Sequence, residues 1–326
     1  MKPLDRIFEA CRAAPRHILL PEGEDPRVQD AAARAVGDGL ARITLLADPD
    51  RVSRDIAGVT VIDPANAPDL DMLAAECLRL RGAKGVTADQ AQALVRTPLV
   101  QAALRVRLGQ VDGTVGGAVA TTAETVRAAL QFIGRAPGIN TVSSFFLMLS
   151  CAKDAPIKGG MVFADCGLVI APTAQELADI AIASAASAQA LLGEQPRVAL
   201  LSFSTAGSAE HASLTRIREA LALVRRSAPQ LEIEGEIQFD AAIDDAIRFR
   251  KAPGSTLSAR PNVFVFPDLA SGNIGYKIAQ RLGGLTAIGP VLQGLNRPAN
   301  DLSRGCSAED ILAMIAVTSV QGLSRA

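Results

Sequence analysis

A short polar stretch near the C-terminus carries the residue types that bind anions and transfer groups between them. Ser303 and Arg304 place a hydroxyl and a guanidinium side by side. Gly305 follows, and a glycine lets the backbone approach a ligand closely. Ser307 and Asp310 then have the Ser-x-x-Asp spacing of a helix start before an apolar run. A helix N-terminus beside an arginine favours an anion, so the stretch predicts an anion site next to an acid/base group.

The spacing alone leaves two interpretations of Asp310 open. As a cap, its carboxylate would bind groups of the first helical turn, which is the commoner use of this pattern. As a general base, it would take a proton from a nucleophile. A carboxylate has enough acceptor positions for both roles.

The longer string PVLQGLNRPANDLSRGCSAEDI, residues 290–311, resembles the C-terminal signature of the phosphate acetyltransferase (phosphotransacetylase) family. That family moves an acetyl group between coenzyme A and inorganic phosphate. Other stretches extend the resemblance over nearly the whole chain: VDGTVGGAVATTAETVRAALQFI (111–133), VFADCGLVIAPTAQELADIAI (162–182), LSFSTAGSAEH (201–211) and GEIQFDAAI (235–243). The RTPLVQAALRV segment matches poorly. Ala206 stands where the family often has a lysine, so one cation is missing.

The resemblance implies a role for each polar residue of the site. Arg304, Arg81 and Arg127 would hold the anions of phosphate and coenzyme A. Asp310 would take the proton of the coenzyme A thiol, and Ser303 would donate to the developing oxyanion or sulfur. The acetyl group would pass directly within a ternary complex, without an acyl-enzyme, a metal or a permanently bound cofactor; acetyl-CoA and coenzyme A are substrates.

Two glycine-rich segments are further phosphate candidates. The front of 111–133 resembles a phosphate cradle, with Thr122 capping the helix after it. Residues 262–284 are typical of a strand, a glycine-rich turn and a helix opening near Ile274. The backbone of Ser271, Gly272 and Asn273 could hold a phosphate there, with Lys277 adding a cation. An ordinary turn between a strand and a helix explains that segment equally well.

The composition excludes several classes of protein. The net charge is −1, which gives no support for binding nucleic acid or an anionic membrane. No run approaches the ~20 apolar residues of a membrane span, and the N-terminus lacks the apolar core of a signal peptide. Five cysteines without a CxxC pair indicate reduced thiols, so we expect a cytoplasmic protein.

The order of patterns predicts an α/β protein of two domains, because 326 residues exceed one ordinary core. Short strands are expected at 16–24, 41–48 and 59–63, and helices at 26–36, 70–81 and 97–108. A second sheet is expected from strands at 141–148, 159–170 and 197–203, with an Ala-rich helix at 172–192. That helix could lie at a subunit interface or inside the chain.

The predicted domains are 1–138 plus 295–326, which would carry the C-terminal catalytic segment, and an inserted 139–294. The resemblance implies two α/β/α domains with a cleft between them, like isocitrate and isopropylmalate dehydrogenases, and a homodimer.

Four alternatives are weighed against this function. Cys306 near a helix N-terminus could form an acyl-enzyme, although no histidine accompanies it. A phosphate butyryltransferase-like enzyme would keep the fold and change the acyl group. A silent regulatory module of this fold would not need Ser303, Arg304 and Asp310. An isocitrate-type dehydrogenase would need clustered aspartates, which the sequence lacks.

Overall fold

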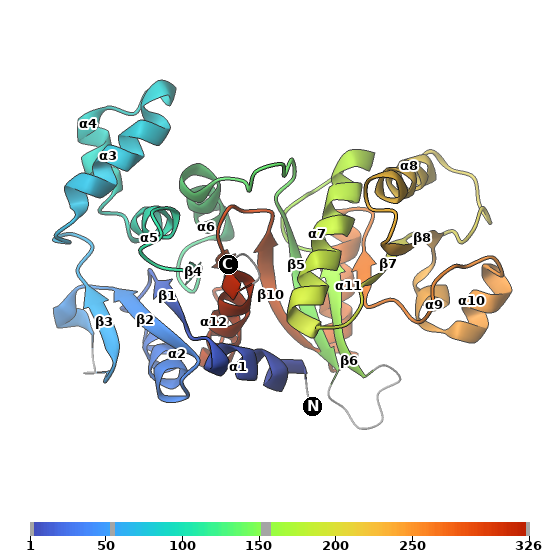
Figure 1. Cartoon of the computed structure of the whole chain (residues 1–326), viewed down its shortest axis with the longest axis horizontal. Helices are drawn as coiled ribbons and strands as arrows, with labels where there is room; N and C mark the ends of the chain where they lie inside the picture. The colour runs from blue at the N-terminus through green and yellow to red at the C-terminus, as the bar shows by residue number, and fades with distance from the viewer. Residues whose placement is uncertain (1–2, 53–55, 151–157, 324–326) are drawn as a thin grey trace. The chain divides into compact units, whose positions relative to one another are not determined.

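The computed structural model describes residues 3–52, 56–150 and 158–323. The chain forms two compact units, one of Leu4–Pro137 with the segment from Leu295 onward, and one of Gly138–Gly294. Each unit contains one β-sheet with helices packed on it (Figure 1). No helix among the described residues is long and apolar enough to cross a membrane.

The sheet of the first unit has five parallel strands in the order β11-β4-β1-β2-β3. They are β1 (Arg16–Leu20), β2 (Ala41–Leu46), β3 (Val59–Ile62), β4 (Gly113–Gly116) and β11 (Ala299–Asp301). Asp301, the last residue of β11, pairs with Gly116, the last residue of β4. Because parallel strands end at the same edge, the loops after β4 and β11 leave the sheet side by side.

Helices cover this sheet on both sides (Figure 1). They are α1 (Pro3–Ala13), α2 (Pro26–Gly37), α3 (Leu70–Arg81), α4 (Ala88–Leu94), α5 (Pro98–Arg107), α6 (Thr122–Ala128), which continues as a π-helical turn (Ala129–Ile133), and α12 (Ala308–Leu323). Helices α2 and α12 pack on each other and on the sheet. Every residue of α12 from Ile311 to Val320 is buried, so its position is fixed by apolar contacts around its whole circumference.

The second unit has a mixed six-stranded sheet in the order β10-β5-β6-β9-β7-β8. The strands are β5 (Ser143–Ser150), β6 (Gly159–Ala164), β7 (Arg197–Leu201), β8 (Glu232–Ile237), β9 (Val263–Val265) and β10 (Thr286–Gln293). The helices are α7 (Ala174–Leu192), α8 (Ala212–Ser227), α9 (Phe239–Ile243), α10 (Asp245–Lys251) and α11 (Leu269–Arg281). Phe146, Phe163, Phe264 and Phe266 belong to its core cluster.

The predicted strands and helices listed above are confirmed as elements, although the strand expected at 159–170 ends six residues earlier, at Ala164. Two short strands were not predicted: β4, within the expected glycine-rich cradle, and β11, within the string 290–311. The packing explains why β4 begins with a glycine. A Cβ at Gly113 would lie 2.7 Å from Cγ2 of Thr318 and 3.2 Å from the Pro298 carbonyl oxygen.

The predicted helix start near Ile274 is wrong. Helix α11 begins at Leu269, five residues earlier, with Asp268 as its N-cap. The Asp268 side chain accepts a hydrogen bond from the backbone N–H of Ser271 at 2.8 Å. An acidic cap after a three-residue strand was therefore the signal for the helix start, and the glycines that suggested a turn lie inside the helix.

Candidate active site

The loop between β11 and α12 carries Ser303 and Arg304, and Asp310 follows in the first turn of α12. The backbone N–H and the hydroxyl of Ser307 both donate to Oδ2 of Asp310, each at 2.9 Å. The N–H of Asp310 donates back to the Ser307 hydroxyl at 3.2 Å. This reciprocal capping box shows that the capping interpretation of Asp310 is correct. Oδ1 of Asp310 receives no hydrogen bond from any residue in the described part of the chain.

Ser303 shapes the same loop from its other end. Its hydroxyl oxygen accepts a hydrogen bond from the N–H of Gly305 at 3.3 Å, and its carbonyl accepts one from Cys306 at 2.9 Å. The side chain is exposed. The hydroxyl hydrogen therefore stays available for a group outside the loop.

The positive charges of Arg304 and Arg127 both act on the carboxylate of Glu124 at the start of α6. Hydrogen bonds from the backbone and hydroxyl of Thr121 lower the pKa of Glu124, and the charges of Arg127 and Arg304 lower it further. Both arginines are exposed. The Arg304 guanidinium makes no hydrogen bond or ion pair with any residue that the structure describes.

The capping residue of α6 is Thr121, so the prediction of Thr122 as the cap is wrong by one position. Thr121 and Glu124 form a capping box in which the Glu124 side chain also binds the N–H of Thr121 at 2.8 Å.

Arg81 is the last residue of α3 and is half-buried. Its positive charge acts on the Cys77 thiol, whose pKa is raised mainly by burial and lowered by Arg81. Among the described residues, no hydrogen bond or ion pair joins Arg81 to the segment from Ser303 to Asp310. Its part in the site stays a prediction.

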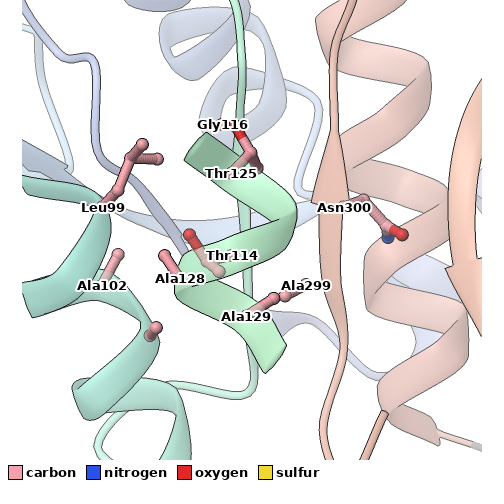
Figure 2. A pocket seen from close by; sticks show the side chains of 10 residues that line it. Leu99, Ala102, Thr114, Gly116, Thr125, Ala128, Ala129, Ala299 and Asn300 are labelled. Carbon is pink, nitrogen blue, oxygen red and sulfur yellow. The ribbon is translucent and has the colours of Figure 1, made fainter. Parts of the chain in front are cut away.

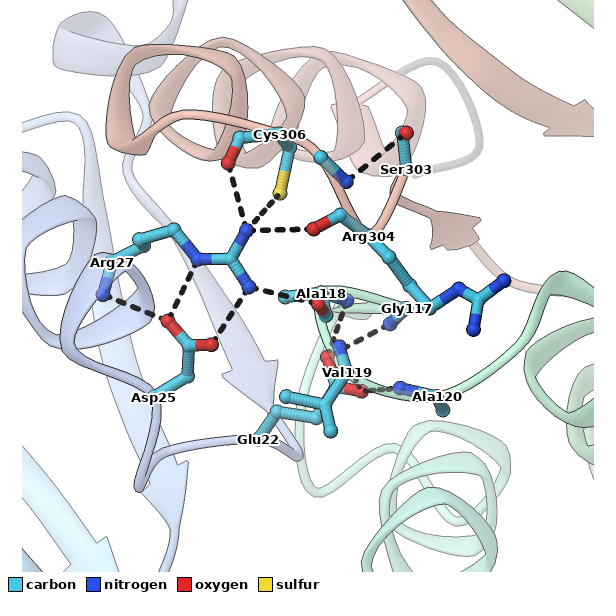
Figure 3. A network of polar contacts seen from close by, with 11 residues as sticks. Glu22, Asp25, Arg27, Gly117, Ala118, Val119, Ala120, Ser303, Arg304 and Cys306 are labelled. Carbon is cyan, nitrogen blue, oxygen red and sulfur yellow. Dashed lines mark hydrogen bonds and ion pairs between the residues drawn. The ribbon is translucent and has the colours of Figure 1, made fainter.

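The glycine-rich loop after β4 is already occupied by a carboxylate (Figure 3). Glu22 accepts four hydrogen bonds from successive backbone N–H groups: Gly117 at 2.9 Å, Ala118 at 2.7 Å, Val119 at 3.0 Å and Ala120 at 2.7 Å. Successive N–H groups of this kind form an anion-binding nest. The predicted cradle therefore exists, but the protein's own side chain fills it in place of a phosphate.

Arg27 ties this loop to the loop of Ser303 and Arg304 (Figure 3). Its guanidinium forms a two-point ion pair with Asp25 and donates to the Ala118 carbonyl at 2.9 Å. It also donates to the carbonyls of Arg304 at 2.8 Å and Cys306 at 2.9 Å. One side chain on α2 thus fixes two loops that leave neighbouring strands.

Cys306 is buried, with 7% of its surface exposed. Burial raises the pKa of its thiol, Asp310 and Asp25 raise it further, and Arg27 lowers it. The expectation that a nearby helix N-terminus activates this thiol is therefore wrong. A neutral, covered thiol does not support an acyl-enzyme.

Asp301 is a completely buried carboxylate directly before this loop. Neither of its oxygens makes a hydrogen bond of normal geometry with a described residue. A Cβ at Gly117 would collide with its Oδ1, so only glycine fits there. Burial raises the pKa of Asp301 to about 6, the hydroxyls of Thr122 and Thr125 lower it, and the charge of Glu22 raises it.

A small pocket lies between α5, α6 and the edge of the sheet (Figure 2). It is lined by Leu99, Ala102, Ala103, Thr114, Gly116, Thr125, Ala128, Ala129, Ala299 and Asn300. Its volume of about 10 Å³ is near the lower limit for a single water molecule. The pocket therefore does not hold a substrate.

The other predicted phosphate residues lie inside α11, in the second unit. The Ser271 hydroxyl and N–H both bind Asp268, and Asn273 donates to the Cys166 carbonyl at 3.1 Å. Lys277 donates to Asn273 at 2.7 Å. The prediction that a helix N-terminus opens onto a ligand at residues 271–273 is therefore wrong, because Asp268 already caps this turn of the helix. Phosphate binding by Ser271, Gly272, Asn273 and Lys277 stays a prediction without that basis.

Sequence reasoning missed Glu22, Asp25 and Arg27. All three lie in PEGEDPR, residues 21–27, directly after strand β1. Their signal was available, because charged residues at the carboxyl end of a buried parallel strand face the edge where ligands bind.

Comparison with known proteins places this geometry in a family. The model of the phosphate acetyl/butaryl transferase family matches residues 3–319. The chain is 66% identical over 321 residues to a phosphate acetyltransferase from Paracoccus denitrificans, covering 98% of this chain and 99% of the relative.

The chain belongs to this family. It is an acyltransferase. A phosphate acetyltransferase from Clostridium acetobutylicum is 41% identical over 98% of both chains. The crystal structure of a phosphotransacetylase from Streptococcus pyogenes superposes with a TM-score of 0.92 and 41% identity, covering 99% of this chain and 98% of the other. The two-sheet α/β fold is therefore that of phosphotransacetylases.

Proposed function

We propose that this enzyme transfers an acetyl group reversibly between coenzyme A and inorganic phosphate. The single observation that supports this most is the pairing of two groups on one loop: the Arg304 guanidinium, without a partner in the described chain, and the exposed hydroxyl of Ser303. An arginine with no internal partner at a family-specific position is available for a phosphate, whose two oxygens match its planar fork.

The reaction forms one bond to the carbonyl carbon and breaks another. In the direction of acetyl-CoA, the coenzyme A sulfur attacks the carbonyl carbon of acetyl phosphate, and the C–O bond to phosphate breaks. The thiol, whose pKa is about 8.5, must lose its proton as it attacks. Negative charge builds on the carbonyl oxygen as the sulfur attacks. The phosphate then leaves with this negative charge and takes up the proton that the thiol has lost.

Asp310 is the proposed base for the thiol. Its Oδ2 is used by the capping box, and Oδ1 is left for the substrate. The thiol proton passes to this carboxylate as the sulfur attacks. Ser303 donates to the developing oxyanion or to the sulfur.

Arg304 and Arg127 bind the anionic groups of the substrates in this proposal, together with Arg81. Glu124 lies near both Arg304 and Arg127, and it moderates their positive charge when no substrate is bound. The α11 residues Ser271, Gly272, Asn273 and Lys277 are assigned to a phosphate group of the substrates from their sequence pattern alone. Ala206 stands where the family often has a lysine, so the positive charge of that lysine is missing.

A homodimer and a cytoplasmic location belong to the same proposal, as does the kinship of the fold with isocitrate and isopropylmalate dehydrogenases. One apolar stripe supports the dimer. Ile274 and Ile278 of α11 and Leu282 at its end lie four residues apart and are 58%, 54% and 85% exposed. A stripe of this kind on a soluble enzyme favours contact with another chain.

Thiol release from acetyl-CoA and from butyryl-CoA, each with and without phosphate or arsenate, tests the function. We expect release from acetyl-CoA that requires the oxyanion and is not reduced by EDTA, because arginines supply the positive charge. Faster release from butyryl-CoA would favour the butyryltransferase. No release with either substrate would favour a silent regulatory domain.

A further inference from the structure

We propose that Arg27 is a positioning residue that orients both Ser303 and Asp310 through two peptide planes of the loop. The proposal rests on the proposed function only for what those two side chains do. Its basis is the set of contacts that Arg27 makes with the backbone between them (Figure 3).

The first plane joins Arg304 to Gly305. A peptide is planar and trans, so its C=O and its N–H point in opposite directions. The carbonyl of Arg304 accepts from Nη1 of Arg27 at 2.8 Å. The N–H of Gly305, on the same plane, donates to the Ser303 hydroxyl oxygen at 3.3 Å. When Arg27 binds the Arg304 carbonyl, it therefore also fixes the direction of the Gly305 N–H that binds the Ser303 hydroxyl.

The second plane joins Cys306 to Ser307. Its carbonyl accepts from the same Nη1 of Arg27 at 2.9 Å. Its N–H donates to Oδ2 of Asp310 at 2.9 Å. The orientation of Asp310, and with it the direction of the unoccupied Oδ1, is thus linked to the same guanidinium nitrogen.

Arg27 itself is held rigidly enough to act in this way. Asp25 binds its Nε at 3.0 Å and its Nη2 at 2.8 Å. Nη2 also donates to the Ala118 carbonyl at 2.9 Å. Asp25 is only 12% exposed, and its pKa is lowered first by the hydrogen bond from Arg27. The guanidinium therefore has one fixed position, with Nη1 directed at the loop.

Lysine cannot reproduce this arrangement, because it has one nitrogen at the end of a flexible stem. An ammonium can bind Asp25 or the loop carbonyls, but it does not hold Asp25, Ala118 and both planes together. Arg27→Lys keeps the charge near the site and removes the fork. The variant therefore tests the orientation of Ser303 and Asp310 separately from the positive charge at position 27.

The test compares Arg27→Lys with the unchanged enzyme by two readouts. In acetyl transfer, we expect kcat to fall on the order of 10- to 100-fold, with smaller changes in KM, because misplaced reacting groups cost this much while the substrate-binding arginines remain.

The second readout needs no activity. Cys306 is a buried residue of this loop, and its sulfur lies 4.0 Å from Nη1 of Arg27. Its alkylation by iodoacetamide, followed by peptide mass spectrometry, reports whether the loop is held. We expect alkylation to be several-fold faster in Arg27→Lys. If the unchanged enzyme shows no acetyl transfer, the proposed function fails, and alkylation still decides the role of Arg27.

A matched control is available on the same helix. Arg34 also links α2 to the first turn of α12, by an ion pair with Glu309 at 2.7 Å, but both side chains are exposed. Arg34→Lys should change neither readout, because exposed pairs contribute little. If Arg27→Lys does not fold, Asp25→Asn replaces it as the test variant. Asp25→Asn should also make the alkylation of Cys306 faster. Folded variants with unchanged kcat and protected Cys306 would overturn the proposal.

Discussion

Glu22 accepts a hydrogen bond of 2.9 Å from the backbone N–H of Gly117 and binds the next three N–H groups as well. A side chain from the loop after β1 therefore does what a bound phosphate does in other glycine-rich loops. This internal carboxylate keeps the loop after β4 in one conformation before any substrate arrives. In the proposed mechanism, the phosphate of the substrate binds on the Arg304 side of the site, outside this loop.

Glu22→Gln should destabilise the protein although the shapes are nearly identical. The amide has one oxygen for four N–H groups and turns an NH₂ donor toward them. We expect a loss of roughly 1–3 kcal/mol in the free energy of unfolding, measured with urea, because unsatisfied donors and lost charged hydrogen bonds cost this much. Glu24→Gln, at an exposed neighbouring position, is the control and should change little. Equal stability of both variants would show that the nest does not need its carboxylate.

Arg304→Lys should reduce kcat/KM for acetyl phosphate about tenfold or more. Lysine keeps the charge but cannot bind two oxygens of one phosphate, and a lost charge-assisted hydrogen bond costs about 1.5–3 kcal/mol. The exposed side chain has no partner in the described chain, so the thermal midpoint should stay unchanged. Steady-state kinetics with both substrates checks this. Unchanged values for acetyl phosphate and coenzyme A would remove Arg304 from the site.

Cys306→Ala should leave most of the activity. The thiol is buried and its pKa is raised, so it is a packing group. Removing one buried sulfur should cost roughly 1 kcal/mol of stability. Turnover and thermal midpoint of the variant are the measurements. Turnover at background level in a folded variant would restore the acyl-enzyme mechanism.

Asp301→Asn should stabilise the protein at pH 8 more than at pH 4.5. The pKa of Asp301 rises from 3.8 to about 6 on folding, so the folded state holds its proton more tightly than the unfolded state. The associated stability is present below pH 4 and is lost as the pH rises through 6. At pH 8 the buried charge costs roughly 2–3 kcal/mol, which the neutral amide avoids. Thermal midpoints across this range test it, and an equal gain at both pH values would contradict it.

The sequence predicted the larger elements because their patterns are long. Leu70–Arg81 and Ala174–Leu192 form the expected helices, since several turns of apolar spacing point to one face. Strands β4 and β11 were not predicted, because segments of four and three residues are too short to show a hydrophobic period. Their pairing depends on α12 packing against Gly113, a contact between residues about 200 positions apart that no local pattern contains.

The candidate site was predicted only where one segment carries it. Ser303 and Arg304 lie on the loop before α12 and Asp310 in its first turn, and the Ser307 capping box follows from local spacing. Glu22 and Arg27 act on backbone groups of distant loops, at Gly117–Ala120 and at Arg304 and Cys306. Every residue has a backbone C=O and almost every one an N–H, so a side chain that binds these groups does not require particular residue types in the loop it contacts. No sequence motif therefore indicates such a contact.

Asp310→Asn tests the central claim most directly, with turnover and thermal midpoint measured on the same variant. The amide still accepts the cap hydrogen bonds through its oxygen, so the loss of stability should be about 1 kcal/mol or less. Turnover should fall by a factor on the order of 10² or more, because the amide cannot take the thiol proton. Glu309→Gln removes an exposed charge from the same helical turn and should keep normal turnover. If Asp310→Asn turns over as fast as Glu309→Gln, Asp310 is only a cap and the base lies elsewhere.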